Sequence, residues 1–170
     1  METSNNTYTN PEENTDNSKF IQLIVFKLSE QYYALPIDEI REVVLTPNIT
    51  KVPLTPDYII GVANIRGNIF AVLDMEKRFQ LTTEKSDDPA DKKSFTLVLA
   101  HEELKLGILV REVPNALSVK QKDMDLSPNL IKDSHSKKDF IRGIVKHDDQ
   151  IILLINVLNL VNKEDFKTLL

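Results

Sequence analysis

Residues 59–74 read Ile-Ile-Gly-Val-Ala-Asn-Ile-Arg-Gly-Asn-Ile-Phe-Ala-Val-Leu-Asp, and residues 141–156 read Ile-Arg-Gly-Ile-Val-Lys-His-Asp-Asp-Gln-Ile-Ile-Leu-Leu-Ile-Asn. Each stretch holds an apolar segment, a short run of turn-forming residues and a second apolar segment. From the glycine at the third position to the closing Asp or Asn, both span 13 residues (74 − 61 and 156 − 143). This pattern predicts two related β-hairpins, with turns at Gly67–Asn68 and at 148–150.

A second repeated segment lies upstream of each hairpin. Six positions of the first half match six positions of the second half at an offset of 73 residues: Ile24, Phe26, Ala34, Glu39, Ile40 and Val43 match Leu97, Leu99, Gly107, Glu112, Val113 and Ala116. A duplicated set of short strands predicts two similar β units packed together. We therefore expect functional surfaces on the units and in the groove between them.

The composition describes an acidic chain that can bury a core. Of its 170 residues 41% are apolar, and the formal net charge of −5 argues against binding to nucleic-acid phosphates. The absence of cysteine excludes disulfides, thiol catalysis and Cys-ligated zinc. No signal peptide is recognisable, and the longest apolar run, residues 151–155, is far too short to span a membrane. We expect a soluble cytoplasmic protein without direct membrane insertion.

Most of the other segments read as short strands. Alternating or continuous apolar residues predict strands at 20–28, 32–35, 95–100 and 104–110, with one or two more within 113–125. Helical spacing of Ile37, Ile40, Val43 and Val44 predicts a short helix or coil after Pro36. The remaining assignments are a disordered tail at 1–18, a short helix at 75–81, a linker at 82–93, a polar loop at 126–138 and an amphipathic C-terminal helix at 156–170.

This order of elements favours a mainly β fold, a pair of small Greek-key or SH3-like barrels, over a parallel α/β sheet. The folded region is expected to cover residues 19–162. The first barrel is expected at about 36–81 and the second at about 94–155, and an exchange of the N- and C-terminal segments between the barrels is left open.

Catalytic and metal-binding patterns are not found in the sequence. His101, His135 and His147 have no partner at a metal-ligand spacing, and the four glycines form no phosphate-binding loop. Glu42 and Asp74 are candidate acids, but the sequence pairs neither with a base or a second carboxylate. We predict a protein that is not an enzyme and that needs no metal or cofactor.

Several residues suit partner binding, and each has a structural alternative. Arg66, beside the predicted turn, is either an ordinary exposed arginine or an interface anchor. The apolar stripe of Ile37, Ile40 and Val43 is either core or a partly exposed groove. Gly61 and Gly143 most simply permit a bulge or a close backbone approach within a strand.

The segment 59–74 resembles the signature of the CheW family of chemotaxis coupling proteins, an apolar strand leading into Asn-Leu-Arg-Gly and a second strand that ends Val-Asp-Leu. Ile37-x-x-Ile40-x-Glu42-Val43 is similar to the family segment that precedes it. Residues 140–143 and 152–156 resemble the family's second hairpin. The likeness extends from about Phe20 to Val161.

The resemblance implies two five-stranded SH3-like barrels around a shared core, with short helices and a C-terminal helix. It implies an adaptor that couples the cytoplasmic tips of chemoreceptors (methyl-accepting chemotaxis proteins) to the regulatory domain of the histidine kinase CheA. Such a protein is expected to be a monomer when free and to be recruited to membrane-associated receptor arrays. The implied receptor-binding groove comprises Ile40, Glu42, Val43, Phe95, Ala116 and Gly143, and the implied kinase-binding residues are Arg66 and Gly67.

Two departures from the family pattern accompany this likeness. Asp74-Met75-Glu76 stands where Asp-Leu-Arg is usual, and Asp125 and Leu130 stand where the family often has Arg and an aromatic residue for a ring-closing contact with the kinase. An acid at that contact is expected to repel the usual partner. The alternatives to the main interpretation are an interaction module of a paralogous, non-swimming chemosensory pathway and a small-barrel nucleic-acid binder.

Overall fold

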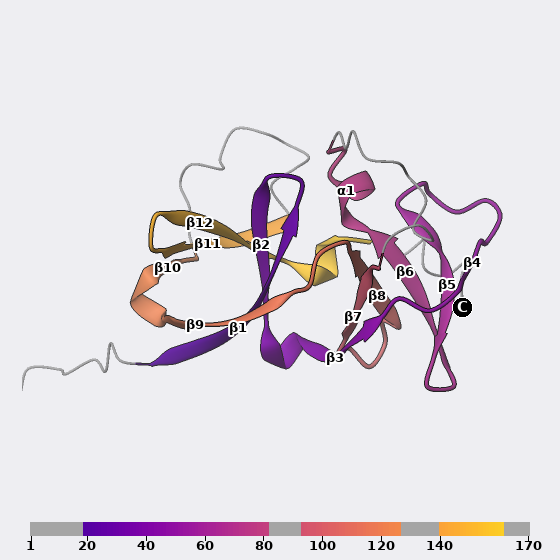
Figure 1. Ribbon diagram of the computed structural model, residues 1–170, viewed down its shortest axis with the longest axis horizontal. Coiled ribbons are helices and arrows are strands. Elements are labelled where there is room, and N and C mark those ends of the chain that lie inside the picture. Colours follow the sequence, from indigo (N-terminus) through magenta and orange to yellow (C-terminus); the bar gives the residue numbers. More distant parts are fainter. Residues whose placement is uncertain (1–18, 82–92, 127–139, 162–170) are drawn as a thin grey trace, which may run out of the picture.

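The structure, a computed structural model, describes residues 19–81, 93–126 and 140–161. Within these ranges the chain forms two six-stranded sheets, which we call sheet A and sheet B and which lie side by side (Figure 1). Six predictions fall partly or wholly outside the described residues: the tail at 1–18, the linker at 82–93, the loop at 126–138, Leu130, His135, and most of the helix at 156–170.

Sheet A has the spatial order β10-β11-β12-β2-β1-β9. Neighbouring strands are antiparallel except β12 and β2, which are parallel. Its strands are β1 (Phe20–Leu28), β2 (Gln31–Pro36), β9 (Asn115–Lys120), β10 (Met124–Asp125), β11 (Ile141–His147) and β12 (Gln150–Ile155).

Sheet B has the spatial order β3-β7-β8-β6-β5-β4, and here β6 and β8 form the one parallel pair. Its strands are β3 (Ile40–Leu45), β4 (Ile49–Thr50), β5 (Ile59–Ile65), β6 (Asn68–Asp74), β7 (Phe95–Leu99) and β8 (Leu106–Val110). The described helices are short: η1 (Ile37–Glu39), α1 (Met75–Arg78), η3 (Gln121–Asp123) and η6 (Val157–Asn159). No helix in the described ranges is long and apolar enough to cross a membrane.

The two sheets are built alike. In sheet B read from its β4 edge, the strands β4, β5, β6, β8, β7 and β3 take the places of β10, β11, β12, β2, β1 and β9 in sheet A. The duplication seen in the sequence is therefore a duplication of topology. Each sheet has six strands, and the outermost strand β4 or β10 is only two residues long.

The halves of the repeat exchange their first hairpins. Hairpin β1–β2 pairs with the strands of the second half through the parallel contact of β2 with β12, and hairpin β7–β8 pairs with those of the first half through β8 and β6. The sheets therefore differ from the contiguous ranges 36–81 and 94–155 expected from the sequence, because β1 and β2 complete sheet A, whereas β7 and β8 complete sheet B.

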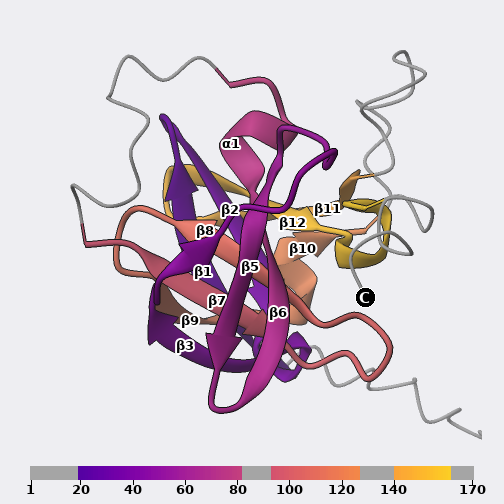
Figure 2. The same cartoon turned by 90° about the vertical axis from the view of Figure 1, so that its right-hand side faces the viewer.

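Each sheet curls toward a closed barrel. The outermost strands of sheet A, β9 and β10, are consecutive in the chain and are joined by the single turn η3, so the two edges of the sheet come together. β3 and β4 are the edges of sheet B and are likewise consecutive. Figure 2 shows the β5–β6 hairpin facing the viewer, with α1 at one end of it and the hairpin turn at the other.

Apolar side chains fill three layers. One cluster lies on the inner side of the curled sheet A and includes Leu23, Val25, Ala34 and Leu154. Two smaller clusters, around Val72 and around Val98, lie on the inner side of sheet B. The largest cluster lies between the sheets and takes side chains from both; it includes Phe26, Leu35, Leu73, Leu97, Ile108 and Ile155. This shared core holds the two sheets together, because burial of many large apolar side chains contributes more free energy than any single surface contact.

The glycines at the equivalent positions of β5 and β11 have the predicted role. The pairing shifts by one residue between Ile59 and Gly61 and between Ile141 and Gly143, which is a β-bulge in each case. A Cβ atom on Gly61 would lie 2.3 Å from the carbonyl oxygen of Thr50, and one on Gly143 would lie 2.9 Å from that of Asp125. The short strands β4 and β10 can therefore cross only where the side chain is missing.

Three local predictions need correction. The segment after Pro36 is not a helix carrying an apolar stripe: it makes only the single turn η1 and then strand β3, where the β-branched residues Ile40, Val43 and Val44 pair with β7. The hairpin turn has Arg66 and Gly67 at its centre rather than Gly67 and Asn68, and both have positive φ, 51° and 85°. The helix predicted at 75–81 ends at Arg78.

Candidate partner-binding surface

The outer edges of the two sheets leave a strip of the shared core partly uncovered. On β1, Ile24 points to the same side as Phe26 and Leu28, which belong to the shared core. Ala116 on the edge strand β9 pairs directly with Ile24 and is exposed. Because paired residues project to the same face of a sheet, Ala116 extends the apolar face of sheet A beyond the buried core.

Sheet B has a matching edge. Val43 and Leu45 on the edge strand β3 pair with Leu97 and Phe95 on β7. Leu97 is fully buried in the shared core and Phe95 packs partly against it, whereas Val43 and Leu45 are exposed. Ile40, at the start of β3, is also packed against the shared core. The structure thus gives Ile40, Val43, Phe95 and Ala116 one property in common: they lie on faces turned toward the shared core, at or next to its outer edges. We call these four residues and Ile24 the inter-sheet strip.

Glu42 lies on the opposite face of β3. It pairs with Val98, whose side chain belongs to the interior of sheet B, after a bulge between Ile40 and Glu42. Its carboxylate accepts a hydrogen bond of 2.7 Å from Arg66 Nε, and the Arg66 side chain is 77% exposed whereas that of Glu42 is 22% exposed. The structure therefore brings Glu42 together with Arg66 and Gly67 rather than with the inter-sheet strip.

The Arg66 turn is rigid for local reasons. Gly67 N donates a hydrogen bond of 2.9 Å to the side-chain oxygen of Asn64, and the two positive φ angles match the tight turn that best suits the twist of a hairpin. The turn therefore presents the Arg66 side chain beside β3, where its guanidinium bonds to Glu42. An exposed arginine held in this way can bind a carboxylate with two parallel hydrogen bonds.

Gly143, Asp125 and Leu130 have other settings. Gly143 is buried beneath β10, next to Asp125 and Leu126, and lies away from the edge strand β9. Asp125 is exposed on β10, and Leu130 lies outside the described residues.

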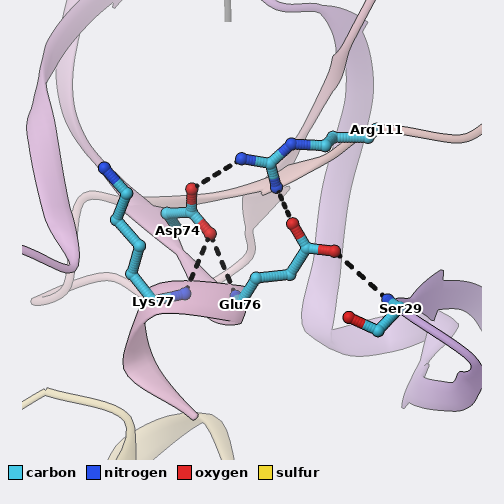
Figure 3. A network of polar contacts seen from close by, with 5 residues as sticks. All are labelled: Ser29, Asp74, Glu76, Lys77 and Arg111. Carbon is cyan, nitrogen blue, oxygen red and sulfur yellow. Dashed lines mark hydrogen bonds and ion pairs between the residues drawn. The ribbon is translucent and has the colours of Figure 1, made fainter. Parts of the chain in front are cut away.

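A buried polar network joins the sheets at the end opposite the Arg66 turn (Figure 3). The Arg111 guanidinium, after β8, bonds to Asp74 Oδ2 at 2.9 Å and to a carboxylate oxygen of Glu76. Asp74 also caps α1 by accepting from the N–H groups of Glu76 and Lys77, and Glu76 accepts from Ser29 N in the β1–β2 turn at 3.1 Å. Glu76 is one of the departures from the family pattern, and Arg111 supplies the positive charge beside it.

Sequence reasoning missed this network because Arg111 is distant from Asp74 in the chain. The available signal was the Asp-x-Glu spacing at 74–76, since two carboxylates directly after an apolar strand require a cation when they are buried. Among the described residues, no three His, Cys, Asp or Glu side chains come together as metal ligands.

Two joined SH3-like barrels with a partly uncovered apolar edge define a class of adaptor protein. A sequence model of the CheW-like domain matches residues 22–165, and the chain therefore belongs to the CheW family, whose members are scaffold and adaptor proteins rather than enzymes.

Named relatives agree with this assignment. The chain is 32% identical over 149 residues to "Chemotaxis protein CheW" of Helicobacter pylori, covering 88% of this chain and 86% of the relative. It is 24% identical over 153 residues to the protein of the same name from Treponema pallidum, covering 90% and 89%. The crystal structure of the scaffolding protein TtCheW from Thermoanaerobacter tengcongensis superposes with a TM-score of 0.72 at 30% identity, covering 86% of this chain and 91% of that one.

Proposed function

We propose that this protein is a cytoplasmic chemotaxis adaptor that couples the cytoplasmic tips of chemoreceptors to the regulatory domain of the histidine kinase CheA, at membrane-associated receptor arrays. Membership of the CheW family and similarity to proteins named for chemotaxis support this role. The observation that carries the proposal to particular residues is the inter-sheet strip. It offers apolar side chains at the edges of both sheets, on β1 and β9 in sheet A and on β3 and β7 in sheet B.

An amphipathic helix is the partner that this shape suits. A helix presents an apolar stripe along one face, and such a stripe can pack into a shallow apolar groove. We propose that the receptor contributes this helix and that Ile40, Val43, Phe95 and Ala116 contact it. Glu42 and Gly143 would support the groove indirectly, through the Arg66 turn and through the path of β10 and β11.

The Arg66 turn is the proposed kinase contact. Arg66 is exposed, and within the described part of the chain its guanidinium pairs with the carboxylate of Glu42, so a carboxylate of the kinase can share it. The location of Arg66 on the face of β3 away from the inter-sheet strip allows the receptor and the kinase to bind at the same time. Simultaneous binding is what an adaptor requires.

Calorimetric titration tests both contacts separately. The protein is titrated with a purified receptor-tip hairpin and, in a second series, with the isolated CheA regulatory domain from the same cell. Val43→Lys should weaken binding of the receptor tip at least tenfold, because it buries a charge in an apolar contact. Arg66→Glu should weaken binding of the kinase domain and leave binding of the tip nearly unchanged.

Ile151→Lys is the matched control for Val43→Lys. Ile151 is an exposed apolar residue on a strand of sheet A, 54% exposed, and it lies on β12 rather than at the inter-sheet strip. Equal weakening by both variants, or no binding of either partner to the folded wild-type protein, would refute the proposed function.

A further inference from the structure

The start of β1 and the end of β9 form an aromatic and basic surface that continues the inter-sheet strip. Phe20 pairs with Lys120, and its side chain is 56% exposed. Gln121 N donates to the carbonyl oxygen of Lys19 at 2.9 Å, which places Lys19 and Lys122 on the same part of the molecule. We call Lys19, Phe20, Lys120 and Lys122 the Phe20–Lys120 corner. All four side chains are exposed.

Strand alternation places Phe20 and Lys120 on the same face as the inter-sheet strip. Phe20, Gln22 and Ile24 alternate along one side of β1, and their partners Lys120, Ser118 and Ala116 alternate along the same side of β9. Ile21 and Leu23 point the other way, into sheet A. Gln22 and Ser118 are joined by a hydrogen bond of 3.0 Å, so the apolar end and the basic end are parts of one continuous two-stranded surface.

Within residues 19–81, 93–126 and 140–161, the fold leaves the corner open. The pairing of β1 with β2 begins at Leu23 and Pro36, so Phe20 extends past the end of β2. The chain turns away there into η1, which packs on β1 and carries the exposed side chain of Ile37. Phe20 is therefore an exposed apolar side chain beside Lys120, whereas the whole chain has a net charge of −5. Asp38 and Asp123 are the exposed acids on the adjoining elements.

We propose that the Phe20–Lys120 corner is a second contact for the helix that occupies the inter-sheet strip, and that it selects helices carrying carboxylates at that end. This inference rests on the proposed function and specifies the chemistry of the partner. An apolar residue of the helix would pack on Phe20, and neighbouring Asp or Glu side chains would pair with Lys120 and with Lys19 or Lys122. Arrangement of opposite charges around an apolar contact provides orientation and partner choice more than total affinity.

The distance along the strands sets where those carboxylates must lie. Four residues separate Ile24 from Phe20, which at about 3.4 Å per residue is roughly 13 Å. A helix rises about 1.5 Å per residue, so roughly nine helical residues cover that length. Residues nine apart lie on opposite sides of a helix, so the acidic group must occupy a neighbouring position on the face that contacts the protein. The selected helix should therefore carry it roughly two or three turns, about seven, eight or eleven residues, from the apolar residue that contacts Ala116 and Ile24.

The test uses the full-length protein and the purified receptor-tip hairpin. We expect Phe20→Ala and Lys120→Glu each to weaken binding of the tip about three- to tenfold, since each removes one contact at the edge of an interface. Raising the salt concentration should weaken binding of the wild type more than binding of Lys120→Glu, because salt screens exposed charge pairs. Ile151→Ala and Lys146→Glu are matched controls for exposure and charge, because both lie elsewhere on sheet A, and they should bind like the wild type.

The outcomes separate the two proposals. If Val43→Lys abolishes binding of the tip while Phe20→Ala and Lys120→Glu leave it unchanged, the corner proposal is wrong and the proposed function stands. If the wild type does not bind the tip, both are wrong. A further result against the corner proposal would be self-association of the protein in sedimentation measurements that either corner variant abolishes, because the corner would then bind a second copy of the chain. Melting temperatures within about 2 °C of the wild type would show that the variants are folded.

Discussion

Replacement of Arg111 by Met should destabilise the protein strongly, although Arg111 lies at the surface end of the buried network. The change keeps most of the apolar stem of the side chain and removes the guanidinium that bonds to Asp74 and Glu76. The side chain of Asp74 is 1% exposed and that of Glu76 is 9% exposed, so two carboxylates would be left together without a cation and with little access to water.

The magnitude follows from the burial of the three groups. Removal of one partner of a buried ion pair costs about 3–5 kcal/mol. The lower end applies here, because the Arg111 side chain is 28% exposed and because Asp74 and Glu76 keep hydrogen bonds from the N–H groups of Glu76, Lys77 and Ser29. We expect a loss of about 3 kcal/mol, which corresponds to a fall in melting temperature of roughly 6–12 °C for a chain of this size.

Urea unfolding followed by circular dichroism, together with calorimetric melting, measures this loss. The double variant Arg111→Met with Glu76→Gln should recover part of the stability, because the neutral amide removes one of the unpaired charges and can still accept from Ser29 N. Lys27→Ala, which breaks the exposed pair with Glu30, is the control and should leave the melting temperature unchanged. A loss below about 1 kcal/mol for Arg111→Met would refute the reasoning, since it would mean that water replaces the guanidinium at little cost.

Three further predictions concern the backbone and one phenol. Gly61→Ala should lower the free energy of unfolding by about 3 kcal/mol or more, because its Cβ would meet the Thr50 backbone. Gly67→Ala should lower it by only about 1 kcal/mol, because its Cβ meets nothing within 4 Å and only the positive φ is unfavourable. Equal losses in urea titrations would contradict the bulge argument. Ser29→Gly should stabilise the protein by about 1 kcal/mol, because Ser29 has a positive φ of 51° and a buried hydroxyl without a hydrogen-bond partner. A lower melting temperature for this variant would contradict this reasoning, because it would mean that the hydroxyl stabilises the native state. Burial raises the pKa of the Tyr33 phenol above its ordinary value of 10.0. The stability that the neutral phenol contributes is therefore complete below about pH 10 and is lost as the pH rises through the raised pKa. Melting curves between pH 8 and pH 12 should show a smaller fall in melting temperature at alkaline pH for Tyr33→Phe than for the wild type.

The two hairpins and the duplication could be predicted from the sequence because each depends on residues close together in the chain. The pattern of residues 59–74 and 141–156 required only apolar spacing and turn chemistry, and both hairpins form as predicted apart from a shift of one residue in the first turn. The bulges at Gly61 and Gly143 were also predictable, since a glycine inside an apolar strand has few other uses. The segment after Pro36 was misjudged because its apolar residues fit both a helical and an extended pattern, and the pairing of β3 with β7 decides between the two.

Some residues of the candidate site could be predicted from the sequence, and others could be placed only from the structure. Resemblance to the CheW family pointed to Ile40, Val43, Phe95 and Ala116, and the structure gives all four the same relation to the shared core. It was not evident from the sequence that Glu42 lies on the other face of its strand, since the bulge after Ile40 changes the alternation. The Phe20–Lys120 corner was equally hidden, because Phe20 and Lys120 come together only through the pairing of β1 with β9.

Residue types at short spacing were enough to predict the class of structure, the number of repeated units and the family, and to show that the sequence carries no catalytic motif. Three features required the folded chain: which hairpin completes which barrel, how Arg111 neutralises Asp74 and Glu76, and which side chains remain at the edges of the shared core. These features depend on contacts between residues far apart in the chain. The physical reason is that strand exchange between two similar halves preserves every local pattern, so only the packing of the two sheets against each other distinguishes the arrangement that forms.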